Sequence, residues 1–492
     1  MHPLARLDLS CVWHPFTQMQ DWLQREPIVI SSGQGALLRD VRGRTYLDAN
    51  SSIWTNLHGH RHPTLDRALS RQLKKIAHSS ALGLANGPAA LLASKLVAVA
   101  NHGPARNSKN HPRLEKVFFS DDGSTAIEVA LKLAYEFSRR TGHSRRPRFL
   151  SLDAAYHGDT VGAVSLGHID LFHQRYQGLL FKSDKVMSPA CYRCPYNRAR
   201  PERADAREYR RCQWECIGEL EKKFEAAKKR RNPITAFVFE PLIQGAAGML
   251  AHPSGWLRKA AEIARGHGAL LIADEVMTGF GRTGTEVRGQ RSEVRGQKSA
   301  VRGQKSWLGL FACQHEQVRP DFLALAKGLT GGYLPMAATL TTQTVFDAFL
   351  GEYKDYKTFF HGHSYTGNQL GAAAALASLE ILSTPASQHA RQALEQGMKQ
   401  ELADLWDSPN IGDIRQVGLV AGIELVSNWR TRQPFPPARQ MGIRVCQSMA
   451  RRGVLTRPIG NVIVLMPPYC TTRRQLQRMI EALRESVQEV CG

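Results

Sequence analysis

Short apolar runs alternate with helical patterns through the middle of the chain. The runs have the length and branched side chains of buried strands, and they cover residues 116–120, 148–152, 235–240, 269–274 and 322–326. One helical pattern follows the first run and stops near Thr141–Gly142, and another, 255–268, leads directly into the run 269–274. This alternation predicts an α/β fold with a mainly parallel sheet.

The C-terminal part has a different pattern. Gly418–Val426 and Val462–Met466 have the character of strands, whereas Arg439–Arg451 and Arg473–Val490 have the period of amphipathic helices. This mixture predicts a smaller α+β domain that packs against the first one.

A tandem repeat interrupts the central region. EVRGQRS, EVRGQKS and AVRGQKS follow one another from Glu286 to Ser306, and each copy has one apolar side chain larger than alanine. A coiled coil needs two apolar positions in every seven, so the repeat does not predict one. We expect a flexible, basic and exposed insertion instead.

The net charge of +22 is high for a chain of 492 residues, and it is concentrated in segments 192–231 and 288–305. A nucleic-acid partner would explain such a charge, but no nucleic-acid-binding motif accompanies it, so a solvated basic surface is favoured. No apolar run approaches the roughly 20 residues of a membrane helix, and the first residues lack a secretory pattern. We therefore expect a cytoplasmic enzyme without a membrane or nucleic-acid partner.

Four of the nine cysteines lie close together in the sequence. Cys191 and Cys194 form a C-x-x-C pair, and Cys212 and Cys216 follow. Such a set can ligate zinc or an iron–sulfur cluster. The looser second pair and the lack of a histidine between the pairs favour reduced thiols, and the metal stays as the alternative.

Three polar features, each directly after a predicted strand, form a candidate site. Gly123 and Ser124 open a helix whose free N–H groups can hold a phosphate, although a serine cap would have the same sequence. Asp274 ends a buried strand, where a carboxylate needs a cationic partner unless it caps the next turn. Lys327 follows another strand and is a candidate Schiff-base nucleophile, whereas an isolated lysine would simply reach solvent. Their common place at strand ends favours the functional interpretation.

Long strings in the sequence carry a family resemblance that spans about residues 12–470. These strings are WHPFTQM, DDGSTAIEVALKLA, YHGDTVGAVSLG, FEPLIQGAAGM, DEVMTGFGRTG, LAKGLTGGYLPMAATL, HGHSYTGN and RPIGNVIVLMPP. The chain resembles the class III (fold type I) aminotransferases, which use pyridoxal 5'-phosphate (PLP). Within them it is most similar to the 7,8-diaminopelargonate synthases of biotin biosynthesis.

The resemblance implies a role for each matching residue. Lys327 would bind PLP as a Schiff base and move the proton, Asp274 would pair with the pyridine nitrogen, and Tyr156 would stack on the ring. The other cofactor-binding positions are Gly123, Ser124, Val276, His363 and Ser364. In this family, the residue that matches Ser364 binds the cofactor phosphate in the active site of the neighbouring subunit. This implies a homodimer with shared active sites. The implied substrate-binding positions are Phe16, Trp54, Tyr156, Lys327, Gly332 and Arg457, the last of which would meet the carboxylate of 8-amino-7-oxononanoate.

Some positions depart from the best-known members of the family. Ile53 stands where those members have the first of two tryptophans, Phe16 replaces a tyrosine, and His363-Ser364-Tyr365 replaces Pro-Thr-Phe. S-adenosylmethionine is the expected amino donor, and lysine remains open. The alternatives are another class III ω-aminotransferase, acting on ornithine, 4-aminobutyrate or another ω-amine, and a basic nucleic-acid-binding protein on a degenerate enzyme fold.

The resemblance also implies the domain organisation. We expect a large domain with a mainly parallel seven-stranded sheet and a smaller α+β domain that is built from both ends of the chain. The expected boundaries are 1–60 for the N-terminal part of the small domain, 61–345 for the large domain with its insertion 286–306, and 346–492 for the C-terminal part.

Overall fold

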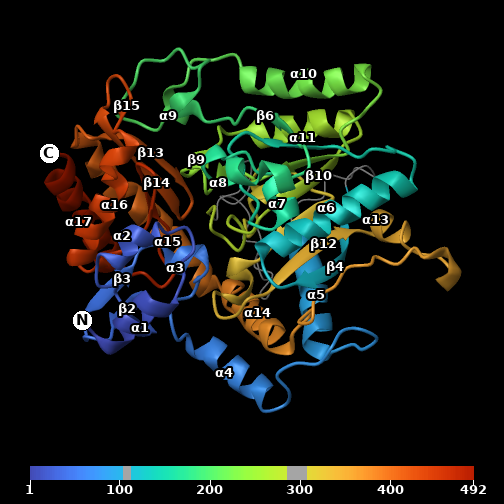
Figure 1. The fold of residues 1–492 in the computed structure, drawn as a ribbon, viewed down its shortest axis with the longest axis horizontal. Coiled ribbons are helices and arrows are strands. Elements are labelled where there is room, and N and C mark those ends of the chain that lie inside the picture. Colours follow the sequence, from blue (N-terminus) through green and yellow to red (C-terminus); the bar gives the residue numbers. More distant parts are fainter. Residues whose placement is uncertain (103–111, 285–306, 308) are drawn as a thin grey trace, which may run out of the picture.

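The fold was determined as a computed structural model that describes residues 1–102, 112–284, 307 and 309–492. The repeat 286–306 therefore lies outside the described residues. The largest sheet crosses the middle of the molecule (Figure 1). In spatial order its strands are β4 (Leu114–Ser120), β12 (Ala337–Thr342), β11 (Phe322–Leu325), β10 (Leu270–Asp274), β7 (Ala236–Phe239), β5 (Phe149–Leu152) and β6 (Asp184–Val186).

The seven-stranded sheet is mainly parallel, as the sequence predicts. The pairs β6–β5, β5–β7, β7–β10 and β10–β11 are parallel, whereas β12 runs opposite to both β11 and β4. Strands β5, β7, β11 and β12 are buried along their whole length. Burial on both faces explains why these strands are continuous apolar runs rather than alternating patterns.

Helices cover both faces of this sheet, and neighbouring residues of a strand serve opposite faces. Ile272 and Phe322 pack with apolar residues of α6 (Gly123–Arg140), whereas Leu271 and Leu323 belong to the core on the other side. The helices of that other side are α5 (Gly87–Ala100), α10 (Glu215–Lys229), α11 (Trp256–Gly266) and α14 (Gln369–Leu382). This period of two places the sheet between two layers of helices.

The two ends of the chain lie next to each other. The strands β1 (Ile30–Gln34), β2 (Leu37–Asp40) and β3 (Thr45–Asp48) form a meander, and β16 (Val454–Leu455) pairs in parallel with β3. In Figure 1 this blue segment lies beside the red C-terminal elements. The combination agrees with an α+β unit from both termini, and the exact domain boundaries stay a prediction.

The C-terminal region contains a second sheet and three helices. Its strands are β13 (Ile411–Val417), β14 (Val420–Asn428), β18 (Val462–Leu465) and β17 (Pro458–Ile459), with β15 (Gln433–Pro434) paired to β14. The helices of this region are α15 (Pro385–Ala403), α16 (Met441–Arg451) and α17 (Arg473–Cys491). The strand predicted from Gly418 begins at Val420, because Gly418, with φ of 59°, and Leu419 form the turn of the β13–β14 hairpin.

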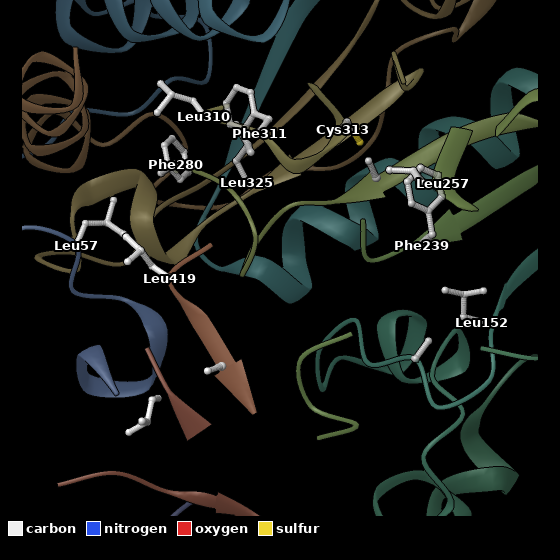
Figure 2. Packing of buried hydrophobic residues seen from close by; sticks show 14 of the residues in the cluster. Leu57, Leu152, Phe239, Leu257, Phe280, Leu310, Phe311, Cys313, Leu325 and Leu419 are labelled. Carbon is white, nitrogen blue, oxygen red and sulfur yellow. The ribbon is translucent and has the colours of Figure 1, made fainter. Parts of the chain in front are cut away.

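One part of the core next to the sheet is aromatic. Figure 2 shows Phe280 and Phe311 close together, with Leu310 beside Phe311 and Leu57 of the N-terminal segment below. The two phenyl rings meet edge to face at 5.6 Å. Gly328 approaches this cluster so closely that a β-carbon there would lie 3.1 Å from Leu57 and 3.2 Å from Phe280. This packing fixes the turn that follows Lys327.

Among the described residues no single helix is long and apolar enough to cross a bilayer. The helix Gln369–Leu382 and the segment Pro385–Asp407, bent by 73°, meet those criteria only as a pair.

Candidate active site

A cavity of about 440 Å³ opens where the strands of the large sheet end. This volume is typical of pockets for small molecules. Asp274 ends β10, Lys327 follows β11, and Glu240 follows β7, while the turn after β4 leads into α6. The residues at this edge therefore come from segments far apart in the chain, as expected at the carboxyl ends of parallel strands.

Lys327 lines this cavity with its side chain partly buried. Its backbone has φ of 45°, and its Nζ lies 4.8 Å from the centre of the Trp54 ring. Burial lowers the pKa of Lys327, and the charges of Asp274 and Glu240 oppose that effect only in part. A lowered pKa increases the neutral fraction, which is the form that attacks a carbonyl carbon.

Asp274 is held by two hydrogen bonds. One carboxylate oxygen accepts a bond from Nδ1 of the fully buried His157 at 2.8 Å, and the other accepts the N–H of Val276 at 3.1 Å. Burial lowers the pKa of His157, but the hydrogen bond and charge of Asp274 outweigh burial, so the net effect is a raised pKa. The carboxylate thus stays fixed with its charge directed toward the cavity.

Tight backbone packing shapes the end of the cavity at the start of α6. A β-carbon at Gly123 would lie 2.7 Å from Val276, and one at Gly158 would lie 2.1 Å from Oγ of Ser124. Asp122 caps the helix by accepting the N–H of Thr125 at 2.9 Å. The helix N-terminus and these small residues leave room for an anionic group against the backbone.

Glu240 is a buried carboxylate of the cavity wall to which sequence analysis assigned no role. Its two oxygens accept the N–H groups of Tyr156 at 3.2 Å and of Gly245 at 2.8 Å. Burial raises the pKa of Glu240 to about 7, the charge of Asp274 adds to this rise, and His157 opposes it. Like Asp274, it directly follows a buried strand, and that position was the available sequence signal.

This raised pKa predicts a pH-dependent stability. The folded protein retains the proton of Glu240 above the ordinary pKa of 4.5. The contribution of Glu240 to the free energy of unfolding is therefore complete below pH 4.5 and is lost as the pH rises through about 7. We expect Glu240→Gln to remove a contribution of about 3 kcal/mol from the pH dependence of the unfolding free energy. Urea unfolding of both proteins between about pH 5 and pH 8 measures it. The exposed Glu225→Gln serves as control, and parallel curves for wild type and Glu240→Gln would contradict the assignment.

Aromatic side chains surround Tyr156 at the cavity wall. The ring of His173 is stacked on it with centroids 6.3 Å apart, and the rings of Phe16 and Phe172 meet it edge-on at 6.4 and 6.2 Å. The Tyr156 hydroxyl donates to Asp159 at 2.7 Å. Burial and this bond raise the pKa of Tyr156, so the phenol stays neutral.

The structure brings most of the predicted site residues together. Those that line the cavity are Trp54, Gly123, Ser124, Tyr156, Asp274, Val276, Lys327 and Gly332. The remaining four do not line the cavity. Phe16 lies beyond Tyr156, and Nδ1 of His363 lies 3.3 Å from a carboxylate oxygen of Asp121. Ser364 and Arg457, the latter two residues after β16, are exposed. Their roles stay predictions.

The four clustered cysteines are free thiols. Burial raises the pKa of Cys191 to about 12 and that of Cys216 to about 11, so both are protonated at neutral pH. Within the described ranges, no group of three or more His, Cys, Asp or Glu side chains is placed to hold a metal ion, and Cys194 and Cys212 are included in that statement.

Comparison with known proteins identifies the family. The profile of the family described as aminotransferase class-III matches residues 19–289 and 308–487. The adenosylmethionine-8-amino-7-oxononanoate aminotransferase of Nitratidesulfovibrio vulgaris is 45% identical over 98% of this chain and 81% of its own length. The protein of the same name from Geobacter sulfurreducens is 42% identical over 99% of this chain and 97% of its own length.

Solved structures agree with this result. A crystal structure of an adenosylmethionine-8-amino-7-oxononanoate aminotransferase from Methanocaldococcus jannaschii matches with a TM-score of 0.84 at 36% identity, covering 99% of both chains. An amine transaminase from an uncultivated Pseudomonas species, in its PLP-bound form, matches with a TM-score of 0.83 at 31% identity over 98% of this chain and 99% of the other. The chain belongs to the class-III aminotransferases and has their fold type I architecture.

Proposed function

We propose that this aminotransferase binds PLP and transfers an amino group to 8-amino-7-oxononanoate, giving 7,8-diaminononanoate in biotin biosynthesis. The names of the relatives at 42–45% identity support the acceptor. The observation that carries the chemistry is the convergence of Lys327, Asp274 and the Gly123 turn on one cavity. S-adenosylmethionine is the proposed donor, and lysine is the competing one.

The cavity residues fit the cofactor. Gly123 and Ser124 line the cavity at the start of α6, where the free N–H groups of the helix can hold a phosphate, and a β-carbon at Gly123 would lie 2.7 Å from Val276. Asp274 offers a buried carboxylate for a cationic ring nitrogen, and Lys327 offers an amine of lowered pKa for an aldehyde. When bound, PLP would supply that aldehyde and an electron sink for a carbanion at the substrate Cα.

Each of three cavity residues would have its own role in the reaction. Lys327 would hold the cofactor through Nζ, and after displacement by the donor amine its free Nζ would remove the proton from the donor Cα. Asp274, kept in place by His157, would hold the positive charge of the ring nitrogen. Tyr156 would cover one ring face, and the neutral phenol adds no charge there.

A homodimer is part of this proposal. Ser364 is exposed, and its carbonyl accepts a hydrogen bond from His78 at 2.9 Å. Large apolar side chains are exposed on the segments that carry or adjoin His78 and Ser364, among them Leu82, Leu84, Leu91, Phe360 and Tyr365. Such a surface is typical of a protein interface, which supports a second copy that receives Ser364 near its phosphate site.

The donor and acceptor can be identified by two half-reactions. Protein loaded with PLP is mixed separately with S-adenosylmethionine and with lysine, and conversion to the pyridoxamine form is followed by absorbance. We expect S-adenosylmethionine to convert it, and 8-amino-7-oxononanoate, added next, to restore the original spectrum. Conversion by lysine but not by S-adenosylmethionine would identify lysine as the amino donor.

The same assay tests the acceptor. Pyruvate and 2-oxoglutarate serve as comparison acceptors that test the alternative of another class III ω-aminotransferase. Restoration of the spectrum by these acids but not by 8-amino-7-oxononanoate would overturn the biotin-pathway proposal and leave the aminotransferase assignment intact.

A further inference from the structure

The segment that carries Trp54 has an unusual backbone. Ser51, Ser52, Ile53 and Trp54 have φ of 46°, 47°, 64° and 68°, so four successive residues other than glycine lie in the left-handed region. This conformation is unfavourable for L-residues, above all for a β-branched one such as Ile53. Strained backbone of this kind persists only where the surrounding structure holds it, and it is concentrated at functional sites.

Asp48, at the end of β3, makes the contacts that hold this turn. One carboxylate oxygen accepts the N–H of Ser52 at 3.0 Å, and the other accepts the Ser52 hydroxyl at 2.8 Å and Nε2 of His60 at 3.0 Å. The amide of Asn56 donates to Nδ1 of His60 at 3.1 Å, which leaves Nε2 as the donor toward Asp48. Asp48 is 3% exposed, so its carboxylate is buried, while its partners Ser52 and His60 remain partly accessible to solvent.

The turn in its left-handed form presents Trp54 to the cavity. Its indole N–H donates to the side chain of Asn50 at 2.8 Å, and its ring lies 4.8 Å from Nζ of Lys327. The turn also contacts the glycine-rich loop after Lys327, because a β-carbon at Gly332 would lie 2.7 Å from the backbone of Asn56. A change in the turn would therefore move the wall that faces Lys327.

We propose that Asp48, together with His60, is a positioning residue that holds the left-handed turn Ser51–Trp54 and thereby sets the Trp54 ring against Lys327 in the substrate pocket. Burial raises the pKa of Asp48, but the hydrogen bonds from His60 and Ser52 together lower it by more, so the carboxylate stays charged and accepts all its bonds at neutral pH. The kinetic part of this inference rests on the proposed place of Trp54 at the substrate.

The variant Asp48→Asn tests the inference, because asparagine has the same shape but loses the charge and one acceptor oxygen. We expect kcat/KM to fall about 10- to 100-fold, mostly through KM, as a displaced pocket wall would cause. The matched control is Asp40→Asn. Asp40 is an equally buried carboxylate of the same meander, bonded to Arg44 and Tyr46 and without a bond to the turn. We expect Asp40→Asn to lower the free energy of unfolding without raising KM in this way.

A double-mutant cycle separates positioning from general destabilisation. In a Trp54→Ala background, Asp48→Asn should change kcat/KM by less than about twofold, because the ring that it positions is already gone. An undiminished effect in that background would overturn the proposal. If Asp48→Asn folds poorly, Ser52→Ala removes only the hydroxyl bond and should give a smaller change of the same kind.

A readout without substrate keeps this test independent of the proposed function. Hydrogen–deuterium exchange of the full-length holoenzyme should show faster amide exchange at 51–56 in Asp48→Asn and wild-type exchange there in Asp40→Asn. Unchanged exchange at 51–56 would contradict the holding role of Asp48. Faster exchange together with unchanged kinetics would refute the positioning of the pocket wall and leave the aminotransferase assignment untouched.

Discussion

Replacing Lys327 with alanine is expected to abolish covalent attachment of the cofactor and to lower turnover by at least about 10⁴-fold, because both the nucleophile and the base at Cα are lost. Among the described lysines, Lys327 is the one that lines the cavity, and burial lowers the pKa of its amine, which increases the neutral fraction that can attack a carbonyl. Borohydride reduction followed by mass spectrometry of the peptide that contains residue 327 measures the attachment. Lys259→Ala on α11 is the control and should retain both properties.

The same variant tests whether the two subunits share their sites. A mixed dimer of one Lys327→Ala chain and one Ser364→Ala chain contains one site with a native lysine and a native serine from different chains. Activity should therefore reappear in purified mixed dimers although each parent is impaired. Mixed dimers that regain no activity would contradict the contribution of Ser364 to the neighbouring subunit.

Five of the seven strands of the large sheet were predicted from their apolar runs, whereas β6 and β12 were not; β6 is short and only partly buried. The predicted run 322–326 is one residue longer than the strand Phe322–Leu325. The predicted run 269–274 is likewise one residue longer than the strand Leu270–Asp274. Shorter pairings could not be found in this way. The strand Val454–Leu455 pairs with β3 across some 400 residues, and two residues carry no periodic pattern. The opposite direction of β12 likewise depends on the connection rather than on its composition.

The candidate site was predictable where a polar residue directly follows an apolar run. Asp274 and Lys327 have that signal, and both line the cavity. Glu240 has the same position after a strand, whereas His157 has no such signal; both line the cavity, and their roles depend on partners at 274 and 156 that only the folded chain brings near. Asp48 carried even less signal, because its importance comes from the backbone angles of the next residues.

Replacing Asp274 with asparagine should lower kcat by about 10²- to 10⁴-fold while the covalent bond to Lys327 still forms. The buried carboxylate would otherwise hold a positive charge on the ring nitrogen, and an amide cannot. His157 would also lose the charge that raises its pKa. Absorbance titration of the lysine–cofactor band, measured beside kcat, separates loss of the charge from loss of the cofactor.

The adjacent Glu275 offers a matched control for this prediction. It is a fully buried carboxylate that accepts the N–H groups of Ala312 and Cys313 at 2.8 Å each, and it does not line the cavity. Glu275→Gln should therefore lower stability but leave kcat of the folded enzyme within about threefold. A cofactor methylated on its ring nitrogen carries a permanent positive charge, so it should restore part of the activity of Asp274→Asn. Full activity of Asp274→Asn with ordinary PLP would show that the carboxylate does not maintain the charge on which the carbanion depends.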